Sequence, residues 1–238
     1  MAIKKNIVSI HQPNFLPYPG LFCKIAASDT FVIYDTAQYV RGEYHNRNRL
    51  IIGGTPTWAT IPVSFHLGDR IRDVRISPRD LEKTWLKICQ AYAKAEFSNE
   101  CREFLASAFL DANESLCDFN TEIIARICRG LGLNTEIHLL SQLIPETTNR
   151  ATQALIEICV TEMASEYLSG TGGRNYLEFD LFERNNIILS FQQYAPTPYP
   201  QKGQESFHPH LSILDMLFNI GIESSSDLIK SAAMFAAE

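Results

Sequence analysis

The sequence predicts an α/β protein with a mostly parallel β-sheet and helices on both of its faces. Three observations lead to this class. Short β-branched and aromatic runs recur along the chain, stretches of helical periodicity separate them, and proline- and glycine-rich turns lie at the junctions. The 238 residues, 45% of them hydrophobic and 20% charged, are enough for one large folded domain. We therefore expect a single domain over residues 1–238.

The N-terminal segment predicts a βαβ unit. Residues 6–10 form a short buried strand, and the loop HQPNFLPYPG, with three prolines, follows it. Residues 21–27 predict one or two helical turns, and residues 30–34 predict a second strand. Two strands joined by a crossover helix pair in parallel, with a right-handed connection.

A β-rich insertion, roughly residues 40–78, is expected after the second strand. It contains the turn Gly53-Gly54, which is typical of an antiparallel hairpin. Its last part, residues 70–78, alternates charged and apolar residues as a half-exposed strand does. A helical section, roughly residues 80–131, then predicts two or three helices and ends at a pair of glycines around residue 131.

The α/β pattern resumes after this section. Three more strands are predicted, at residues 135–140, 166–168 and 187–191. Three helices are predicted at residues 150–164 (capped within Thr147-Thr148-Asn149), 179–185 and 211–219, the last ending at Gly221. Five strands with interspersed helices predict a Rossmann-like sheet.

Composition argues against several classes of function and location. The 21 Lys and Arg against 27 Asp and Glu give a net charge of -6, which argues against a nucleic-acid groove. No apolar stretch is long enough for membrane insertion, and the N-terminal apolar run is too short for a signal peptide, so a cytoplasmic location is expected. The six cysteines lack CxxC or CxxH spacing, so they predict buried thiols in a reducing compartment and no metal site.

Polar residues follow the first two predicted strands. His11, Gln12 and Asn14 come directly after one strand, and Asp35 ends the next. Ligands of open α/β sheets bind outside strand carboxyl ends, so His11 is a candidate general acid or base and Asp35 a candidate partner. The alternative is that these side chains satisfy the loop backbone and that Asp35 caps a turn.

Two further segments are candidates for ligand binding. Asn46 and Arg47 lie in a run with three arginines, a residue type that recognises phosphate or carboxylate, although a solvated turn has the same composition. The segment Ser169-Gly170-Thr171-Gly172-Gly173-Arg174-Asn175-Tyr176 follows a strand, and its glycines allow close approach of a ligand to the backbone. It matches neither GxGxxG, GxxxxGK[ST] nor GxSxG.

The C-terminal segment FHPHLSILD offers a third candidate. His208 and His210 have the spacing of a metal pair. The reading we favour is that Ser212 or the preceding turn caps a helix, while Asp215 faces inward to bond a loop.

Together these segments resemble the WbqC-like family of bacterial proteins over nearly the whole chain. The resemblance rests on HQPNFLPYPGLFCKIAASDTFVIYD, HNRNR, WATIPV, YLSGTGGRNYL and FHPHLSILDMLFNIG. Arg41 to His45 depart from the more basic or aromatic family pattern. The resemblance implies a site that contains His11, Gln12, Asn14, Asp35, Asn46, Arg47, Gly170, Gly172, Gly173, Tyr176, Ser212 and Asp215, without roles for each.

The resemblance also implies a link to surface polysaccharides, including O-antigen, and a glycine transferase role has been suggested for a relative. We therefore expect an acyl- or aminoacyltransferase that acts on an amino sugar, with His11 as base and Arg47 and the glycine loop on a phosphate. The donor is an activated acyl or aminoacyl group, free or on a carrier protein, the acceptor is a nucleotide-sugar or other small molecule, and no cofactor is required. The alternatives are a nucleotidyltransferase-like enzyme and a non-catalytic binding protein in the same pathway.

Overall fold

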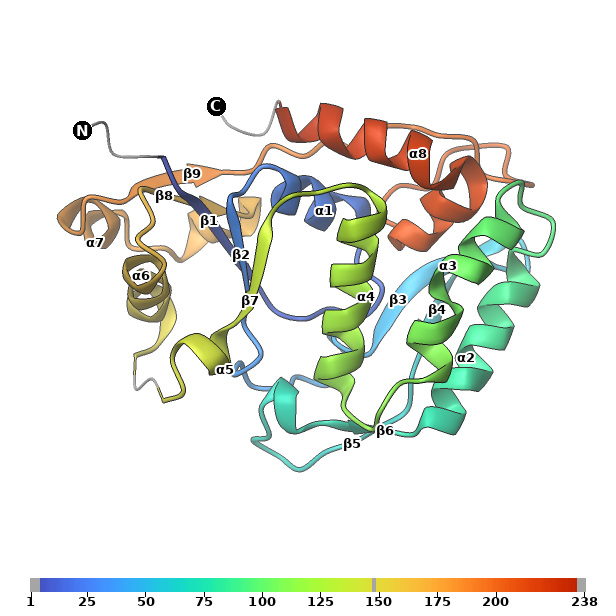
Figure 1. Cartoon of the computed structure of the whole chain (residues 1–238), viewed down its shortest axis with the longest axis horizontal. Helices are drawn as coiled ribbons and strands as arrows, with labels where there is room; N and C mark the ends of the chain where they lie inside the picture. Colours follow the sequence, from blue (N-terminus) through green and yellow to red (C-terminus); the bar gives the residue numbers. More distant parts are fainter. Residues whose placement is uncertain (1–4, 147–148, 235–238) are drawn as a thin grey trace.

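The computed structural model describes residues 5–146 and 149–234 and has an α/β fold (Figure 1). Thr147 and Thr148, two of the three predicted caps, lie outside the described residues. The strands are β1 (Ile7–His11), β2 (Thr30–Ile33), β3 (Arg47–Ile52), β4 (Thr55–Thr60), β5 (Val63–Ser64), β6 (Arg75–Ile76), β7 (Glu136–Leu139), β8 (Glu166–Ser169) and β9 (Ile188–Phe191). The α-helices are α1 (Pro19–Ala26), α2 (Pro78–Ala91), α3 (Ser98–Leu110), α4 (Leu116–Gly130), α5 (Leu140–Leu143), α6 (Ala151–Thr161), α7 (Phe179–Arg184) and α8 (Ile213–Met234), and the 3₁₀ turns are η1 (Ile71–Asp73) and η2 (Thr171–Asn175).

The main sheet has five strands in the order β7-β2-β1-β8-β9, and each neighbouring pair is parallel. The chain leaves β1 toward β2 on one side, and it leaves β8 toward β9 on the other side. The neighbours β1 and β8 therefore form a topological switch point, outside whose carboxyl ends ligands of open α/β sheets bind. His11 and Ser169 are the residues that end these two strands.

Alternate strand residues face two separate hydrophobic cores, because successive side chains point to opposite faces of a sheet. Val8, Ile10 and Val32 pack in one core with residues of α6 and α7. Phe31 and Ile33 pack in the other core with residues of α1, α4 and α8. Helices thus cover both faces, as the sequence predicts (Figure 1).

The predicted insertion is confirmed in its first half and corrected in its second. The strands β3 and β4 form an antiparallel hairpin around Gly53 and Gly54, both of which have positive φ. The predicted strand over 70–78 is wrong, because this segment contains η1 and only the two-residue strand β6. Its buried residues, Ile71, Val74 and Ile76, follow a three-residue and then a two-residue spacing, so one helical turn precedes the short strand.

Helices α2, α3 and α4 form the predicted helical section, which lies away from β9 (Figure 1). An aromatic chain joins it to the loop after β1, since Phe109 contacts Phe119 of α4 and Phe119 contacts Phe15. Asn120 of α4 is fully buried, and its amide donates to the carbonyls of Pro13 and His45, 2.8 Å from each. Helix α4 therefore holds two loops that border the carboxyl end of β1.

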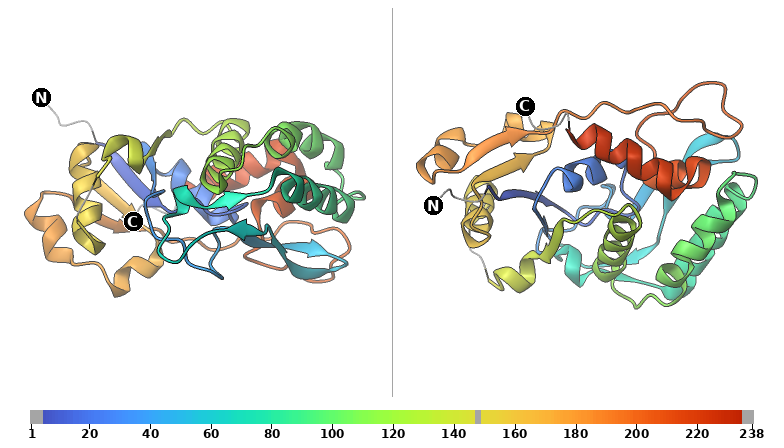
Figure 2. Two further views of the ribbon diagram at one scale, coloured as in Figure 1. Left: turned by 90° about the horizontal axis from the view of Figure 1, so that it is seen from below. Right: turned by 45° about the horizontal axis from the view of Figure 1, so that its top comes forward.

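The C-terminal part crosses the molecule. After β9, residues 192–212 leave the sheet, run past α8 to the β3–β4 hairpin, where Gln204 donates to the Gly54 carbonyl, and return to the start of α8 (Figure 2). Gly221 (φ 76, ψ 172) breaks α8, so the predicted helix end is confirmed and a further helical stretch follows it. A Cβ at Gly221 would lie 2.6 Å from a ring carbon of Phe97, which explains why this kink contains glycine.

All six cysteines are buried and free, as expected. Burial raises the pKa of Cys23, and of Cys117 in α4, to about 12, so these thiols are poor nucleophiles. Within residues 5–146 and 149–234, no helix combines the length and the apolar character needed to cross a bilayer.

Candidate functional site

A cleft of about 550 Å³ opens at the switch point, outside the carboxyl ends of β1 and β8. This volume falls in the range of small-molecule sites. We call it the switch-point cleft. Its lining comes from β1 and the loop after it, α1, the hairpin approach, the β8–η2 connection, the segment after β9 and one residue before α8. The lining residues are Ile10, His11, Asn14, Pro17, Tyr18, Lys24, Tyr44, Asn48, Tyr167, Ser169, Gly170, Thr171, Gly172, Gly173, Tyr176, Gln192, Tyr194 and His210.

His11 is the last residue of β1, and its ring is fixed at one nitrogen. Its Nδ1 lies 2.8 Å from the carbonyl oxygen of Gln12. A carbonyl only accepts, so Nδ1 carries the proton and Nε2 keeps a lone pair. Burial, followed by the charge of Lys24, lowers the pKa of His11 from 6.5 to about 4. His11 is therefore neutral at pH 7, with Nε2 able to accept a proton.

Lys24, which our sequence reasoning did not single out, lies beside His11. It projects from α1, has only 3% of its surface exposed, and its Nζ donates to the carbonyl of Ile10 at 2.9 Å. Burial lowers its pKa from 10.5 to about 7. The signal in the sequence is a lone lysine inside the apolar run LFCKIA, because lysines are almost never fully buried unless they are paired with another group.

The electrostatic character of the cleft is positive to neutral. Its described lining contains one lysine and two histidines but no aspartate, glutamate or arginine. In the described part of the chain, no group of three or more His, Cys, Asp and Glu side chains is arranged to hold a metal ion. The lining thus suits a ligand that carries negative charge.

The glycine loop forms one wall of the switch-point cleft. None of Gly170, Gly172 and Gly173 has a positive φ. A Cβ at Gly170 or Gly172 would meet nothing within 4 Å, whereas a Cβ at Gly173 would collide with Oγ of Ser169 and lie 2.9 Å from Leu177. The first two glycines therefore leave open space, and the third allows η2 to pack closely on the end of β8.

Asn14, Ser169 and Tyr176, all predicted from the sequence, also line the cleft. Gln12, also predicted, does not line the cleft, and its Oε1 is 2.7 Å from Nε2 of His45. Asn48, which the sequence reasoning missed, donates to the carbonyls of Phe15 and Leu16 and so secures the loop after β1 from the hairpin side. These contacts hold the polar loop at the carboxyl end of β1.

Two more predicted ligand contacts, Asn46 and Arg47, lie outside the cleft lining. Asn46 is buried. Its side-chain oxygen accepts from the hydroxyl of Tyr39 and its amide donates to the carbonyl of Ile61, so it supports the base of the hairpin. Arg47 lies over the Trp58 ring, 4.4 Å from its centroid, and its guanidinium donates to the Gly42 carbonyl. The structure therefore does not place Arg47 beside the glycine loop.

Asp35 and the two C-terminal candidates also lie apart from the cleft. Asp35 is buried and accepts from the backbone N–H of Ser141 at the start of α5. Ser212 is fully buried and its Oγ accepts from the N–H of Leu214. Ser212 thus has the helix-capping role that the sequence left open, whereas Asp35 bonds a distant helix and not the turn that follows it, and neither residue lines the cleft with His11.

Asp215 is the centre of a buried hydrogen-bond network. It accepts from Tyr92 at 2.7 Å and from Tyr199 and Gln201 at 2.9 and 2.8 Å. Burial raises its pKa, while these hydrogen bonds oppose the rise. Asp215 faces inward and ties down the loop before α8, as the favoured alternative expected, and His210 from this loop reaches the cleft.

A larger hollow, of about 1040 Å³, lies at the opposite end of the sheet. Lys5 and Ala233, near the two ends of the described chain, form part of its border. The amino ends of the strands are not where ligands of open α/β sheets bind. The switch-point cleft is therefore the better candidate site.

Comparison with known proteins gives two matches. The model of the WbqC-like protein family matches residues 12–227, which include the cleft lining except for Ile10 and His11. The uncharacterised protein Rv1507c of Mycobacterium tuberculosis (strain ATCC 25618 / H37Rv) is 32% identical over 223 residues, which cover 91% of this chain and 95% of the relative. No solved structure matches the chain.

Proposed function

Because the chain belongs to the WbqC-like protein family, we propose that it is an acyl- or aminoacyltransferase that modifies an amino sugar for a bacterial surface polysaccharide such as O-antigen. One observation carries the proposal. A neutral histidine with an available Nε2 ends β1 at the switch point, beside a buried lysine and in a lining without carboxylates. This arrangement is suited to moving a proton next to an anionic substrate.

The strand order supports a Rossmann-like assignment. Numbered by their order in the chain, the five strands of the sheet lie in the order 3-2-1-4-5, with the cleft at the switch point. Such a site commonly receives a nucleotide, and the aromatic rings of Tyr18, Tyr44, Tyr176 and Tyr194 line this one. Flat apolar faces with polar edges suit a sugar or a base, which supports a nucleotide-linked amino sugar as the acceptor.

In the proposed reaction the neutral amine of the sugar attacks the carbonyl carbon of an activated donor. The N–C bond forms, the bond from that carbon to the leaving group breaks, and the amine proton passes to Nε2 of His11. His11 then gives the proton to the leaving group and returns to its starting state. This help is worth roughly 10² to 10⁴ in rate, and the donor itself is the only other reactant needed.

The low pKa of free His11 is compatible with this role. After burial, the charge of Lys24 is the next cause that lowers it. A negative group bound beside Lys24 would offset that charge and make Nε2 more basic. The base would therefore become effective when the substrate is bound.

The test is direct. The purified protein is incubated with a UDP-linked amino sugar and with acetyl-CoA or a glycyl donor, and the acceptor is followed by mass spectrometry. We expect acylated or glycylated sugar, and we expect His11→Ala to reduce the rate by at least a hundredfold while the circular dichroism spectrum stays unchanged. The control is His66→Ala, since His66 is solvent-exposed and its side chain interacts only with nearby Asp69 among the described residues.

The alternatives predict other outcomes. Release of pyrophosphate from ATP or CTP with a sugar phosphate would instead indicate nucleotidyl transfer. Binding of the sugar without turnover, whether the donor is free or on a carrier protein, would indicate a binding protein. Full transfer activity in His11→Ala would rule out the role of His11.

A further inference from the structure

Lys24 is a buried cation without a counter-ion. Only 3% of its surface is exposed, and the one contact of its Nζ within the described residues is the carbonyl of Ile10. Among the described residues, no carboxylate lies within ion-pair distance of the Lys24 Nζ. Burying an ammonium group costs free energy unless an anion compensates, and a carbonyl dipole compensates only in part.

Other polar groups in the cleft lack a side-chain partner as well. The amide of Asn14 and the hydroxyls of Tyr18 and Tyr194 line the same cleft as Lys24, and none makes a side-chain hydrogen bond to another described residue. Amide and hydroxyl groups are neutral donors that complement a single cation around an anion. These groups are therefore available to a ligand rather than used by the fold.

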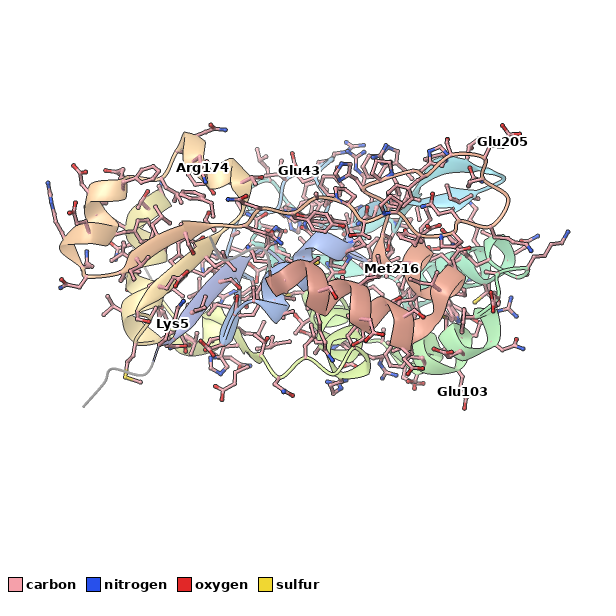
Figure 3. All side chains as sticks on the ribbon, turned by 90° about the horizontal axis from the view of Figure 1, so that it is seen from above. Lys5, Glu43, Glu103, Arg174, Glu205 and Met216 are labelled. Carbon is pink, nitrogen blue, oxygen red and sulfur yellow. The ribbon has the colours of Figure 1, made fainter. Side chains whose placement is uncertain are left out.

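The lining residues differ in exposure, so the cleft has a buried inner end and an exposed outer end. Lys24 is nearly inaccessible, whereas Tyr44 and Tyr176 are 44% and 64% exposed. Arg174 and Glu43, from the two segments that carry these tyrosines, lie along the same side of the molecule (Figure 3). A ligand that spans the cleft thus has one end near the cation and the other between exposed aromatic rings.

We propose that the inner end of the switch-point cleft binds a phosphoryl group of the ligand through Lys24. This inference deepens the proposed function, because it makes a phosphate-bearing molecule, such as a nucleotide-linked sugar, the substrate class. A phosphoryl group offers several oxygens to the neutral donors around Lys24, and the described lining contains no arginine for two-pronged pairing with either phosphate or carboxylate. Lysine acts on phosphate as a point charge.

The assignment replaces Arg47 as the phosphate-binding residue. The guanidinium of Arg47 is used by the Gly42 carbonyl and by the Trp58 ring, and it does not line the cleft. Lys24 comes instead from α1, whose backbone begins directly after the proline-rich loop. Lys24 in α1 and His11 at the end of β1 thereby lie on either side of the first loop of the chain.

The experiment measures binding, not transfer, so it can fail independently of the proposed function. Isothermal titration calorimetry at constant ionic strength compares inorganic phosphate, UDP-N-acetylglucosamine and acetate, with wild type, Lys24→Met and Lys87→Met. Methionine keeps the length and volume of the side chain without its charge. Lys87 is an exposed helical lysine and provides the matched control.

We expect phosphate and UDP-N-acetylglucosamine to bind wild type and Lys87→Met, with affinity at least about tenfold lower in Lys24→Met. Circular dichroism and the unfolding midpoint check that Lys24→Met is folded. If that variant does not fold, NMR of ¹⁵Nζ-labelled lysine in wild type replaces it, and phosphate must shift the buried lysine signal. Equal affinity in Lys24→Met, no phosphate-dependent lysine signal, or binding of acetate in preference to phosphate would overturn the proposal.

Discussion

Replacing Lys24 by methionine should make the protein more stable, because the folded chain keeps this amine buried without an anion. Burial lowers its pKa from 10.5 to about 7. At about 1.4 kcal/mol per pKa unit, the difference corresponds to about 5 kcal/mol of destabilisation at low pH and about 4 kcal/mol at pH 7. The lost hydrogen bond from Nζ to the Ile10 carbonyl offsets about 1 kcal/mol.

The net gain expected for Lys24→Met at pH 7 is about 1–4 kcal/mol in the free energy of unfolding, the range seen when apolar residues replace buried charges. The gain depends on pH with a definite sign. Since the pKa is lower in the folded state, the unfolded chain binds more protons between pH 7 and 10.5, and wild-type stability rises across this window. The advantage of the variant should therefore shrink as pH approaches 10.5.

Urea unfolding at pH 7, 8, 9 and 10 measures this directly, with Lys87→Met as the control that should stay within about 0.5 kcal/mol of wild type. A Lys24→Met variant that is less stable than wild type at pH 7 would refute the reasoning. So would an advantage that stays constant from pH 7 to 10. Either result would mean that the protein itself compensates the charge of Lys24.

Three further predictions follow from the same structure. The pKa of His11 is lowered from 6.5 to about 4, so wild type should lose up to about 3 kcal/mol of stability as pH falls from 6.5 to 4, a loss that His11→Gln should lack when both are unfolded in urea. Asp215→Ala removes the carboxylate that accepts from Tyr92, Tyr199 and Gln201 and leaves the two buried tyrosine hydroxyls without this acceptor, so it should cost about 3–5 kcal/mol by the same assay, and a cost below 1 kcal/mol would contradict the network role. Gly173→Ala should cost about 1–3 kcal/mol because its Cβ collides with Ser169, whereas Gly172→Ala should unfold like wild type in a thermal melt; equal melting points for the two would be inconsistent with the packing described.

The α/β class was predictable because its signals are local. The strands around residues 6–10, 30–34 and 187–191 are short β-branched or aromatic runs, and Gly53-Gly54 marks the hairpin turn. The error over 70–78 has a non-local cause. Alternating charges fit a strand, but the segment bonds to the backbone of Asp35 and Ala37, which no local pattern shows.

The candidate site was predictable only in part. His11, Asn14 and the glycine loop were found because polar residues after a strand mark the carboxyl end of a sheet. Asp35, Arg47 and Asp215 looked equally polar in the sequence. Whether a polar side chain faces a cleft or a buried backbone group depends on neighbours from distant segments, such as Ser141 for Asp35.

The sequence by itself determined the fold class, the position of the polar loop after the first strand and the family to which the chain belongs, because these depend on periodicity, turn residues and ordered motifs. Only the tertiary structure decided the order of the strands, and with it the meeting of the ends of β1 and β8 at one cleft. It also decided the state of Lys24. A lysine in an apolar helix becomes a buried, uncompensated cation only when α1 packs against the end of β1, because desolvation is a property of the surrounding fold and not of the residue.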